Sequence, residues 1–365
     1  MKTKIIPVQI NHYKKLAAFL SSFNFSETTK FKEERSEAFW LSRFDLWWDK
    51  NPAFEKQHLR GLVLINKNKI VGFLGCIPTF FQLGQDTIIV FNETTWRVDK
   101  EFRGLASVEM VTRLLDYSKN SIHFRSGGRQ DAKKMQDWLG FRNIYDQETI
   151  KTYYIISNLR NVLSKRIPFI KRIKVLHSMV YPLSLSYKFL MNLLTNTIKG
   201  TFYVRRIDNP DANFDELWHK TKSIINTNVR TSEVLNWFCS NNDGVSKNTL
   251  FGCYKNKELM GYLMCSSESG PDVLSRTTLV DLWGNLENRH VTNALIKAFI
   301  NYGLANNYDL ILLPILHKAI HRCGKKFLIN KKSMVMQCKV ADQKWDQIKN
   351  GTSYFSYLHG DNGLF

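Results

Sequence analysis

Hydrophobic positions in the first hundred residues change from a helical period to a strand period. Apolar residues fall at helical spacing from Tyr13 to Phe19 and again from Phe31 to Trp48. Asn51-Pro52 is expected to end the second helix, because the residue before a proline avoids the helical conformation. Strand-like runs separated by polar turns follow: residues 61–65, 70–77, 79–83 and 87–97. The pattern therefore predicts two helices followed by an antiparallel meander.

The segment Val98–Met110 comes directly after the last of these strands and opens another helix. A short turn with small residues and Arg103 comes first, and apolar residues then recur at Val108, Val111 and Leu115. The free backbone N–H groups and the helix dipole at such a helix start attract anions. We therefore expect a negatively charged group to bind here.

A strand, a helix and a further strand complete this unit. Residues 121–125 have strand character, and the helical spacing from Asp131 to Leu139 ends at Gly140-Phe141, where the glycine suits a C-cap. Tyr153 to Ile156 is expected to close the unit as a strand. This order of helices, meander and strand–helix–strand predicts an α/β layer arrangement.

The second half of the chain repeats this pattern. Gly261 follows an Asn-Lys turn and lies 189 positions after Gly72, which follows a similar turn. Gly324 lies 184 positions after Gly140. A strand, a helix and a strand come between, in the order of the first half: residues 277–283, 291–302 and 309–313. A tandem duplication is the economical interpretation.

The anion-binding turn is missing from the second copy. Residues 284–291 read Gly-Asn-Leu-Glu-Asn-Arg-His-Val, without a small-residue turn before the helix. Glu287 would repel a bound anion. We expect this copy not to bind the group that the first one holds.

The charge of the chain adds a candidate interaction segment. Its 365 residues carry 52 Lys and Arg against 32 Asp and Glu, a net charge of +20 that favours an acidic partner. Residues 151–200 contain nine basic and no acidic residues, and an apolar run extends from Val175 to Leu194. Two interpretations remain open. The segment is an interdomain helix pair with a solvated basic face, or residues 160–199 contact an anionic membrane.

The cysteines and the N-terminus bear on the cellular compartment. None of the six cysteines has a zinc-binding spacing, and Cys76, Cys253 and Cys265 lie in strand-like runs that predict buried thiols in a reducing compartment. The N-terminus lacks the apolar core of a signal peptide, and no apolar run reaches the ~20 residues of a membrane span. We expect a cytoplasmic protein without a metal site, peripheral at the inner face of the cell membrane if the basic segment binds lipid.

The order of elements in residues 1–157 resembles the GNAT superfamily of acyl-CoA N-acyltransferases. Residues 103–108, Arg-Gly-Leu-Ala-Ser-Val, are similar to its pyrophosphate-binding signature Arg/Gln-x-x-Gly-x-Gly/Ala, and Ala132 through Gly140-Phe141 resembles a later helix of the family. Ala106 and Val108 depart from the signature, and the valine narrows access for a phosphate. The alternative is a GNAT-shaped domain that no longer binds acyl-CoA.

The resemblance implies an α/β fold of two tandem GNAT-like domains, each a mixed, mostly antiparallel sheet flanked by helices. Residues 1–157 would form the first domain, 158–200 a basic amphipathic helical linker and 201–365 a degenerate second domain. An acyl-CoA, acetyl-CoA first among them, would be the cosubstrate. Val98 would offer strand-edge hydrogen bonds to its pantetheine arm. Backbone amides of the signature would hold its pyrophosphate: Arg103, Gly104, Leu105, Ala106, Ser107 and Val108.

The resemblance implies direct attack of an amine on the thioester, which requires a base and a route for the leaving thiolate. Glu93 occupies a strand position where the family often places a carboxylate, and partial burial would raise its pKa toward neutrality. The alternative is a solvated strand residue. The family's general-acid tyrosine is replaced by Gln136, which cannot donate a proton as an acid. Ser126 and His123 are nearby substitutes, and release of the thiolate to solvent is the other possibility.

The acceptor follows from analogy alone. The tryptophan-rich segment that ends in Asn51-Pro-Ala-Phe and the tandem layout resemble GNAT-like proteins of bacterial cell-surface polysaccharide synthesis. That implies an amino sugar, nucleotide-linked or lipid-linked. Trp40, Trp47 and Trp48 themselves are interpreted as core, with a wall of the acceptor pocket as the alternative. A Fem-type aminoacyl transferase would instead use charged tRNA, which the +20 charge suits. A non-catalytic, membrane-associated scaffold is the third hypothesis.

Overall fold

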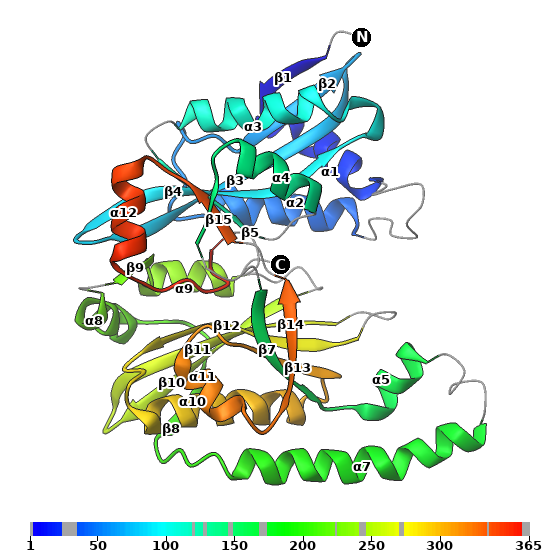
Figure 1. Cartoon of the computed structure of the whole chain (residues 1–365), viewed down its shortest axis with the longest axis vertical. Helices are drawn as coiled ribbons and strands as arrows, with labels where there is room; N and C mark the ends of the chain where they lie inside the picture. Colours follow the sequence, from blue (N-terminus) through cyan, green and yellow to red (C-terminus); the bar gives the residue numbers. More distant parts are fainter. Residues whose placement is uncertain are drawn as a thin grey trace.

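The computed structural model describes ten stretches of the chain: residues 3–23, 35–118, 121–126, 130–144, 149–167, 174–222, 225–240, 246–269, 274–333 and 336–359. Two mixed sheets follow one another along the long axis, each flanked by helices (Figure 1). The predicted α/β class is confirmed.

The strands of the first sheet lie in the order β1–β2–β3–β4–β5–β15–β6. Neighbours are antiparallel except for β4 and β5, which run parallel. A short strand, β9 (Ile225–Asn228), pairs with the end of β3 and also with β16 (Thr352–Ser353). The main strands have these bounds: β1 Lys4–Pro7, β2 Gly61–Asn66, β3 Lys69–Leu83, β4 Asp86–Val98, β5 Ile122–Ser126, β15 Met336–Lys339 and β6 Arg142–Asn143.

The predicted helices flank this sheet. Ser36 caps the second helix by accepting the N–H of Phe39, and Trp40 and Trp48 are fully buried within the cluster that also holds Phe44. The interpretation of the tryptophans as core is therefore confirmed. The helices have these bounds: α1 Tyr13–Ser21, α2 Glu37–Phe44, a π-helical turn Asp45–Asp49, α3 Leu105–Tyr117 and α4 Gln130–Trp138.

The second sheet repeats the strand order of the first. Its order is β8–β10–β11–β12–β13–β7–β14, and the fourth and fifth strands, β12 and β13, again form the parallel pair. This correspondence supports the predicted duplication. The strands have these bounds: β7 Thr149–Ile156, β8 Tyr203–Ile207, β10 Ser246–Lys255, β11 Glu258–Glu268, β12 Arg276–Gly284, β13 Leu310–Pro314 and β14 Leu328–Ser333.

The sixth strand of each sheet comes from the other half of the chain. β7, predicted to close the first unit, pairs instead with β13 and β14 of the second sheet, so that prediction was wrong. β15 in turn enters the first sheet between β5 and β6. The alternating pattern of a strand specifies which side chains are buried, and it does not specify the partner strand. The domain division at residues 157 and 200 stays a prediction, and strand pairing crosses it in both directions.

The basic segment is helical, as predicted, in its described part. α5 (Leu159–Arg166) and α7 (Lys174–Asn196) lie between β7 and β8 in the chain and contact one another, and α7 packs on α10 on the outside of the second unit (Figure 1). The remaining helices are α8 Ala212–Thr221, α9 Ser232–Cys239, α10 Arg289–Ala305, α11 Lys318–Gly324 and α12 Asp342–Asn350. No helix in the described parts of the chain is long and apolar enough to span a bilayer.

Candidate functional site

The parallel strands β4 and β5 separate part of the way along the first sheet. β4 pairs with β3 as far as Val98, but with β5 only from Val90 to Asn92. A register shift between β3 and β4 and the positive φ of Thr95, 47°, mark a bulge just beyond that point. In the described structure, the edge of β4 from residue 93 to 98 therefore faces no strand.

Val98 lies where the sequence analysis expects a strand-edge contact. The N–H of Asp99 donates to Val71 in β3, and successive residues of a strand direct their backbone groups to opposite edges. The backbone groups of Val98 therefore point to the side where β5 has left. Arg103 Nε donates to the Val98 carbonyl at 2.9 Å, which ties the turn before α3 to this edge.

The start of α3 leaves backbone donors open. Gly104 adopts φ +99°, and a Cβ at this position would have no atom within 4 Å. Among the described residues no acceptor lies within reach of the N–H groups of 104–107, and the first turn holds no acidic residue. Val108 differs from the expectation, because its N–H already donates to the Gly104 carbonyl at 3.1 Å. The amides of Gly104 to Ser107, and not that of Val108, are available to an anion.

Glu93 lies on β4 at the point where the strands separate. Its side chain is 6% exposed, and Gln136 Nε2 of α4 donates to Oε2 at 3.0 Å. No group in the described residues hydrogen-bonds to Oε1. Burial raises the pKa of Glu93 to about 7, against the opposing effects of the Arg125 charge and of the Gln136 hydrogen bond. Gln136, which occupies the position of the family's general acid in the sequence, therefore contacts the candidate base Glu93.

A charged and amide-bearing cluster surrounds Glu93. Arg125 on β5 donates to Gln337 Oε1 at 3.4 Å, and Gln337 Nε2 donates to Asp137 Oδ1 of α4 at 2.5 Å. Sequence reasoning missed both Arg125 and Gln337. An arginine inside an otherwise buried strand was a usable signal for the first. Gln337 could not have been found this way, because it arrives on β15 from the other half of the chain.

Ser126 is not brought together with Glu93. The ring of His123 stacks on Phe91, two residues before Glu93 on β4. Because side chains alternate along a strand, His123 and Arg125 lie on the face of Glu93, and Ser126 lies on the opposite face. A serine there cannot replace a general acid beside Glu93.

His123 is a buried, neutral histidine. Its Nε2 contacts Ser118 Oγ, the residue is 1% exposed, and burial lowers its pKa to about 4. The imidazole is packed against Phe91, and this contact indicates that His123 stabilises the packing of β4 against β5.

The equivalent position in the second copy has different chemistry. β12 pairs with its parallel partner β13 only as far as Thr278. The next residue, Leu279, lies opposite Cys265 of β11, just as Glu93 lies opposite Cys76 of β3. Asn288 Oδ1 accepts the N–H of His290 at the start of α10. The expected absence of a second acyl-CoA site stays a prediction, and the missing carboxylate and this cap support it.

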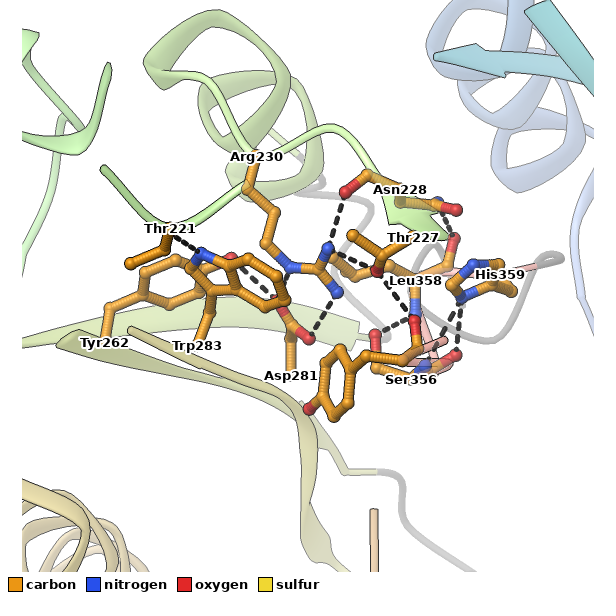
Figure 2. A network of polar contacts seen from close by, with 11 residues as sticks. Thr221, Thr227, Asn228, Arg230, Tyr262, Asp281, Trp283, Ser356, Leu358 and His359 are labelled. Carbon is orange, nitrogen blue, oxygen red and sulfur yellow. Dashed lines mark hydrogen bonds and ion pairs between the residues drawn. The ribbon is translucent and has the colours of Figure 1, made fainter. Parts of the chain in front are cut away.

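A network of buried polar side chains lies between the two sheets (Figure 2). Arg230 donates through Nε and Nη2 to the two oxygens of Asp281, at 2.8 and 3.1 Å, and both side chains are 0% exposed. Tyr262 donates to Asp281 at 2.7 Å, and Trp283 stacks over the guanidinium at 4.3 Å. Arg230 Nη1 donates to Thr227 Oγ1 at 2.7 Å. Sequence reasoning did not single out any of these residues.

This network holds the last described residues of the chain. Thr227 Oγ1 donates to the Tyr354 carbonyl and Asn228 Nδ2 to that of Leu358, at 2.7 and 3.0 Å. The His359 ring lies 5.9 Å from Phe81 and 5.4 Å from Phe124, both in the first half of the chain. Figure 2 shows His359 beside Asn228 and Leu358. Residues 354–359 therefore join the two halves.

The two buried histidines predict a loss of stability in mild acid. Burial lowers the pKa of His123 to about 4 and that of His359 to about 3, from 6.5 in the unfolded chain. Between these values only the unfolded state binds the protons, so stability falls as pH falls from 6.5, by up to about 1.4 kcal/mol per pH unit for each histidine. Glu93 acts in the opposite direction between 4.5 and about 7, because the folded protein binds its proton first.

Urea unfolding between pH 7.5 and 5 measures this slope. His359→Gln should reduce the pH dependence by about one proton, and the exposed substitution His290→Gln should not change it. Equal slopes for the parent protein and His359→Gln would contradict the assignment.

Comparisons with known proteins bear on the fold. No protein-family model and no curated protein matches the chain in sequence. A GCN5-related N-acetyltransferase from Anabaena variabilis is similar in structure over 93% of this chain and 73% of its own, with a TM-score of 0.56 and 9% identity. Saccharomyces cerevisiae N-myristoyltransferase with bound myristoyl-CoA is similar over 92% and 82%, with a TM-score of 0.59 and 10% identity. At these identities the likeness concerns the fold, and it agrees with the sheets described above. The chain has the GCN5-related N-acetyltransferase (GNAT) fold, as the sequence predicted.

Proposed function

We propose that this protein is an acyl-CoA-dependent N-acyltransferase that acts on an amine acceptor. The observation that carries the proposal is Glu93, a buried carboxylate with a pKa of about 7 at the point where β4 leaves β5, to whose Oε1 no described residue donates a hydrogen bond. A buried acceptor atom without a donor is costly, and an acceptor amine would satisfy it.

The acyl donor fits the open backbone groups at the edge of β4 and at the start of α3. The N–H groups of residues 104–107 suit a pyrophosphate, and the absence of an acid in the first turn of α3 leaves the helix dipole unopposed. The edge of β4 from 93 to 98, which pairs with no strand in the described parts of the chain, offers backbone groups to the amide-bearing pantetheine arm. The thioester supplies the activated acyl group.

The amine must lose a proton when it attacks. Its nitrogen forms a bond to the acyl carbon, the carbon–sulfur bond breaks, and the amine proton passes to Glu93. A pKa near 7 keeps a substantial fraction of Glu93 ionised at neutral pH and still makes it a stronger base than an exposed glutamate. Gln136 orients the carboxylate through Oε2 and cannot protonate the thiolate, which leaves to solvent.

Ligand-induced stabilisation tests the donor site. Acetyl-CoA or myristoyl-CoA at about 100 times its Kd should stabilise the protein by ~2.7 kcal/mol, because only the folded state binds it. Arg103→Glu should abolish the shift, since it places a negative charge beside the open amides. Arg289→Glu makes the same change at the start of the equivalent helix α10 and should leave the shift intact. No shift with either thioester, or an equal loss in both variants, would contradict the proposal.

The acceptor class is tested by release of free CoA thiol. We propose an amino sugar, nucleotide-linked or lipid-linked, by analogy with the tandem GNAT-like proteins of polysaccharide synthesis. Glucosamine nucleotides should accelerate thiol release above the hydrolysis background. Transfer from aminoacyl-tRNA without acyl-CoA would instead favour the Fem-type activity.

A further inference from the structure

Helix α7 presents one face to the protein and another to solvent. Met191 and Thr195 are buried, and Tyr187 and Leu194 pack against the same core as α10. The helix extends along the end of the molecule opposite to α3 (Figure 1). The inner face accounts for the attachment of α7 to the second sheet.

The outer face is apolar although it is exposed. At 100° per residue, Phe189 and Leu193 lie opposite to Met191 and Thr195, and the other exposed positions of 181–193 spread from there to both flanks of the helix. The intervening exposed positions on this face are proline, serine and asparagine, and none is charged. Single exposed apolar residues are ordinary, but a contiguous group of this kind marks an interaction surface. Six large side chains, each between 47 and 65% exposed, form it: Tyr181, Leu183, Leu185, Phe189, Leu190 and Leu193.

The surroundings of this face carry positive charge. Residues 151–200 contain nine Lys and Arg and no Asp or Glu, and residues 289–308, which include α10, also lack an acidic residue. Arg166 and Lys199 are exposed, and Arg160 lies over the Tyr181 ring at 5.5 Å. Lys326 Nζ donates to the Leu194 carbonyl at 3.5 Å. Asp309, which follows this acid-free stretch, is buried and is paired with Lys165 at 3.9 Å.

We propose that the outer face of α7 binds an anionic lipid bilayer, with the helix lying in the plane of the surface. The apolar side chains would enter the interface and the flanking Lys and Arg would contact lipid phosphates. A second copy of the chain fits this face less well, because a symmetric contact would bring two acid-free basic segments together. The inference rests on α7 and does not depend on the proposed transferase activity.

Co-sedimentation of the full-length protein with vesicles tests the apolar face. Phosphatidylcholine vesicles with about 30% phosphatidylglycerol should bind the protein, and pure phosphatidylcholine should not. Phe189→Ser with Leu193→Ser should weaken binding by about tenfold or more. Ile10→Ser with Leu41→Ser removes two exposed apolar side chains from the first half and should leave binding unchanged. All four positions are exposed, so the variants should fold, and circular dichroism checks this.

A second arm tests the charge. Arg166→Glu with Lys199→Glu should abolish binding, and Lys14→Glu with Lys15→Glu, an equal change of charge in α1, should reduce it much less. Binding of the parent protein should also fall steeply with salt. Equal binding to neutral vesicles, or no binding to anionic ones, would overturn the proposal. So would a dimer in sedimentation that Phe189→Ser with Leu193→Ser abolishes in the absence of vesicle binding.

Discussion

Replacing Glu93 by glutamine should lower kcat for acyl transfer by about 10² to 10⁴, the usual contribution of a positioned base. The amide keeps the size of the side chain and can still accept from Gln136, but it cannot take up a proton. In the parent protein kcat should rise with pH and level off above about 7, where Glu93 becomes ionised. The variant should lose this rise. Initial rates of thiol release between pH 5.5 and 8.5 measure both effects.

Two further measurements separate catalysis from folding. Glu93→Gln should retain the stabilisation by acyl-CoA, because the carboxylate contacts the amine and not the pyrophosphate. It should also be more stable than the parent protein above pH 7, since the folded state no longer buries an ionised carboxylate. Glu258→Gln replaces an exposed carboxylate of the second copy and should leave kcat unchanged. A kcat within about threefold of the parent value would exclude Glu93 as the base.

Replacing Asp281 by alanine should destabilise the protein by about 3–5 kcal/mol, as expected when one partner of a buried ion pair is removed. Arg230 would remain fully buried without its carboxylate, and Tyr262 would lose the acceptor of its hydroxyl. In the parent protein burial alone would lower the pKa of Arg230, but the charge of Asp281 overrides this and raises it. Asp281→Ala therefore leaves the buried guanidinium without the charge that stabilises its protonated form. Urea unfolding at pH 7.5 measures the change.

Two further variants distinguish the loss of a buried charge pair from the loss of an exposed one. Arg230→Met with Asp281→Leu removes both charges and should recover much of the lost stability. Glu287→Ala breaks the exposed pair with Lys318 and should cost less than about 1 kcal/mol. A loss of less than 1 kcal/mol for Asp281→Ala as well would show that the network contributes little.

Local pattern was sufficient for the elements that carry the first copy of the fold. The period of apolar residues located α3 and α4, and Gly140 indeed ends α4 with a positive φ of 82°. In the meander, the runs 70–77 and 79–83, predicted as separate strands, form the single strand β3. The small-residue turn at Arg103–Ser107 was visible because its chemistry is local. Backbone donors at a helix start depend on the residues of that start alone.

The local spacing of apolar residues could not show which strands pair with one another. β7 was assigned to the wrong sheet, because the burial of alternate residues such as Tyr153 and Ile155 fits either sheet equally well. Ser126 of β5 was grouped with Glu93 of β4, although the pairing of these two strands places the side chains on opposite faces of the sheet. A shift of one residue along a strand moves a side chain to the other face of the sheet. Which residues of two strands share a face is therefore known only once the register of their pairing is known.

By itself the sequence determined the GNAT fold, its duplication, the open helix start after Gly104 and Glu93 as the candidate base. Each of these depends on residues close together in the chain or on a repeat of local pattern. Tertiary structure alone decided that β15 completes the first sheet, that Gln136 and Arg125 surround Glu93, and that Arg230 and Asp281 are buried together between the halves. These contacts join residues far apart in the chain: Glu93 and Arg125 are 32 positions apart, and Arg230 and Asp281 are 51. The pKa of a carboxylate depends on such neighbours and on the loss of water around it, and the local spacing of apolar residues contains no information about either.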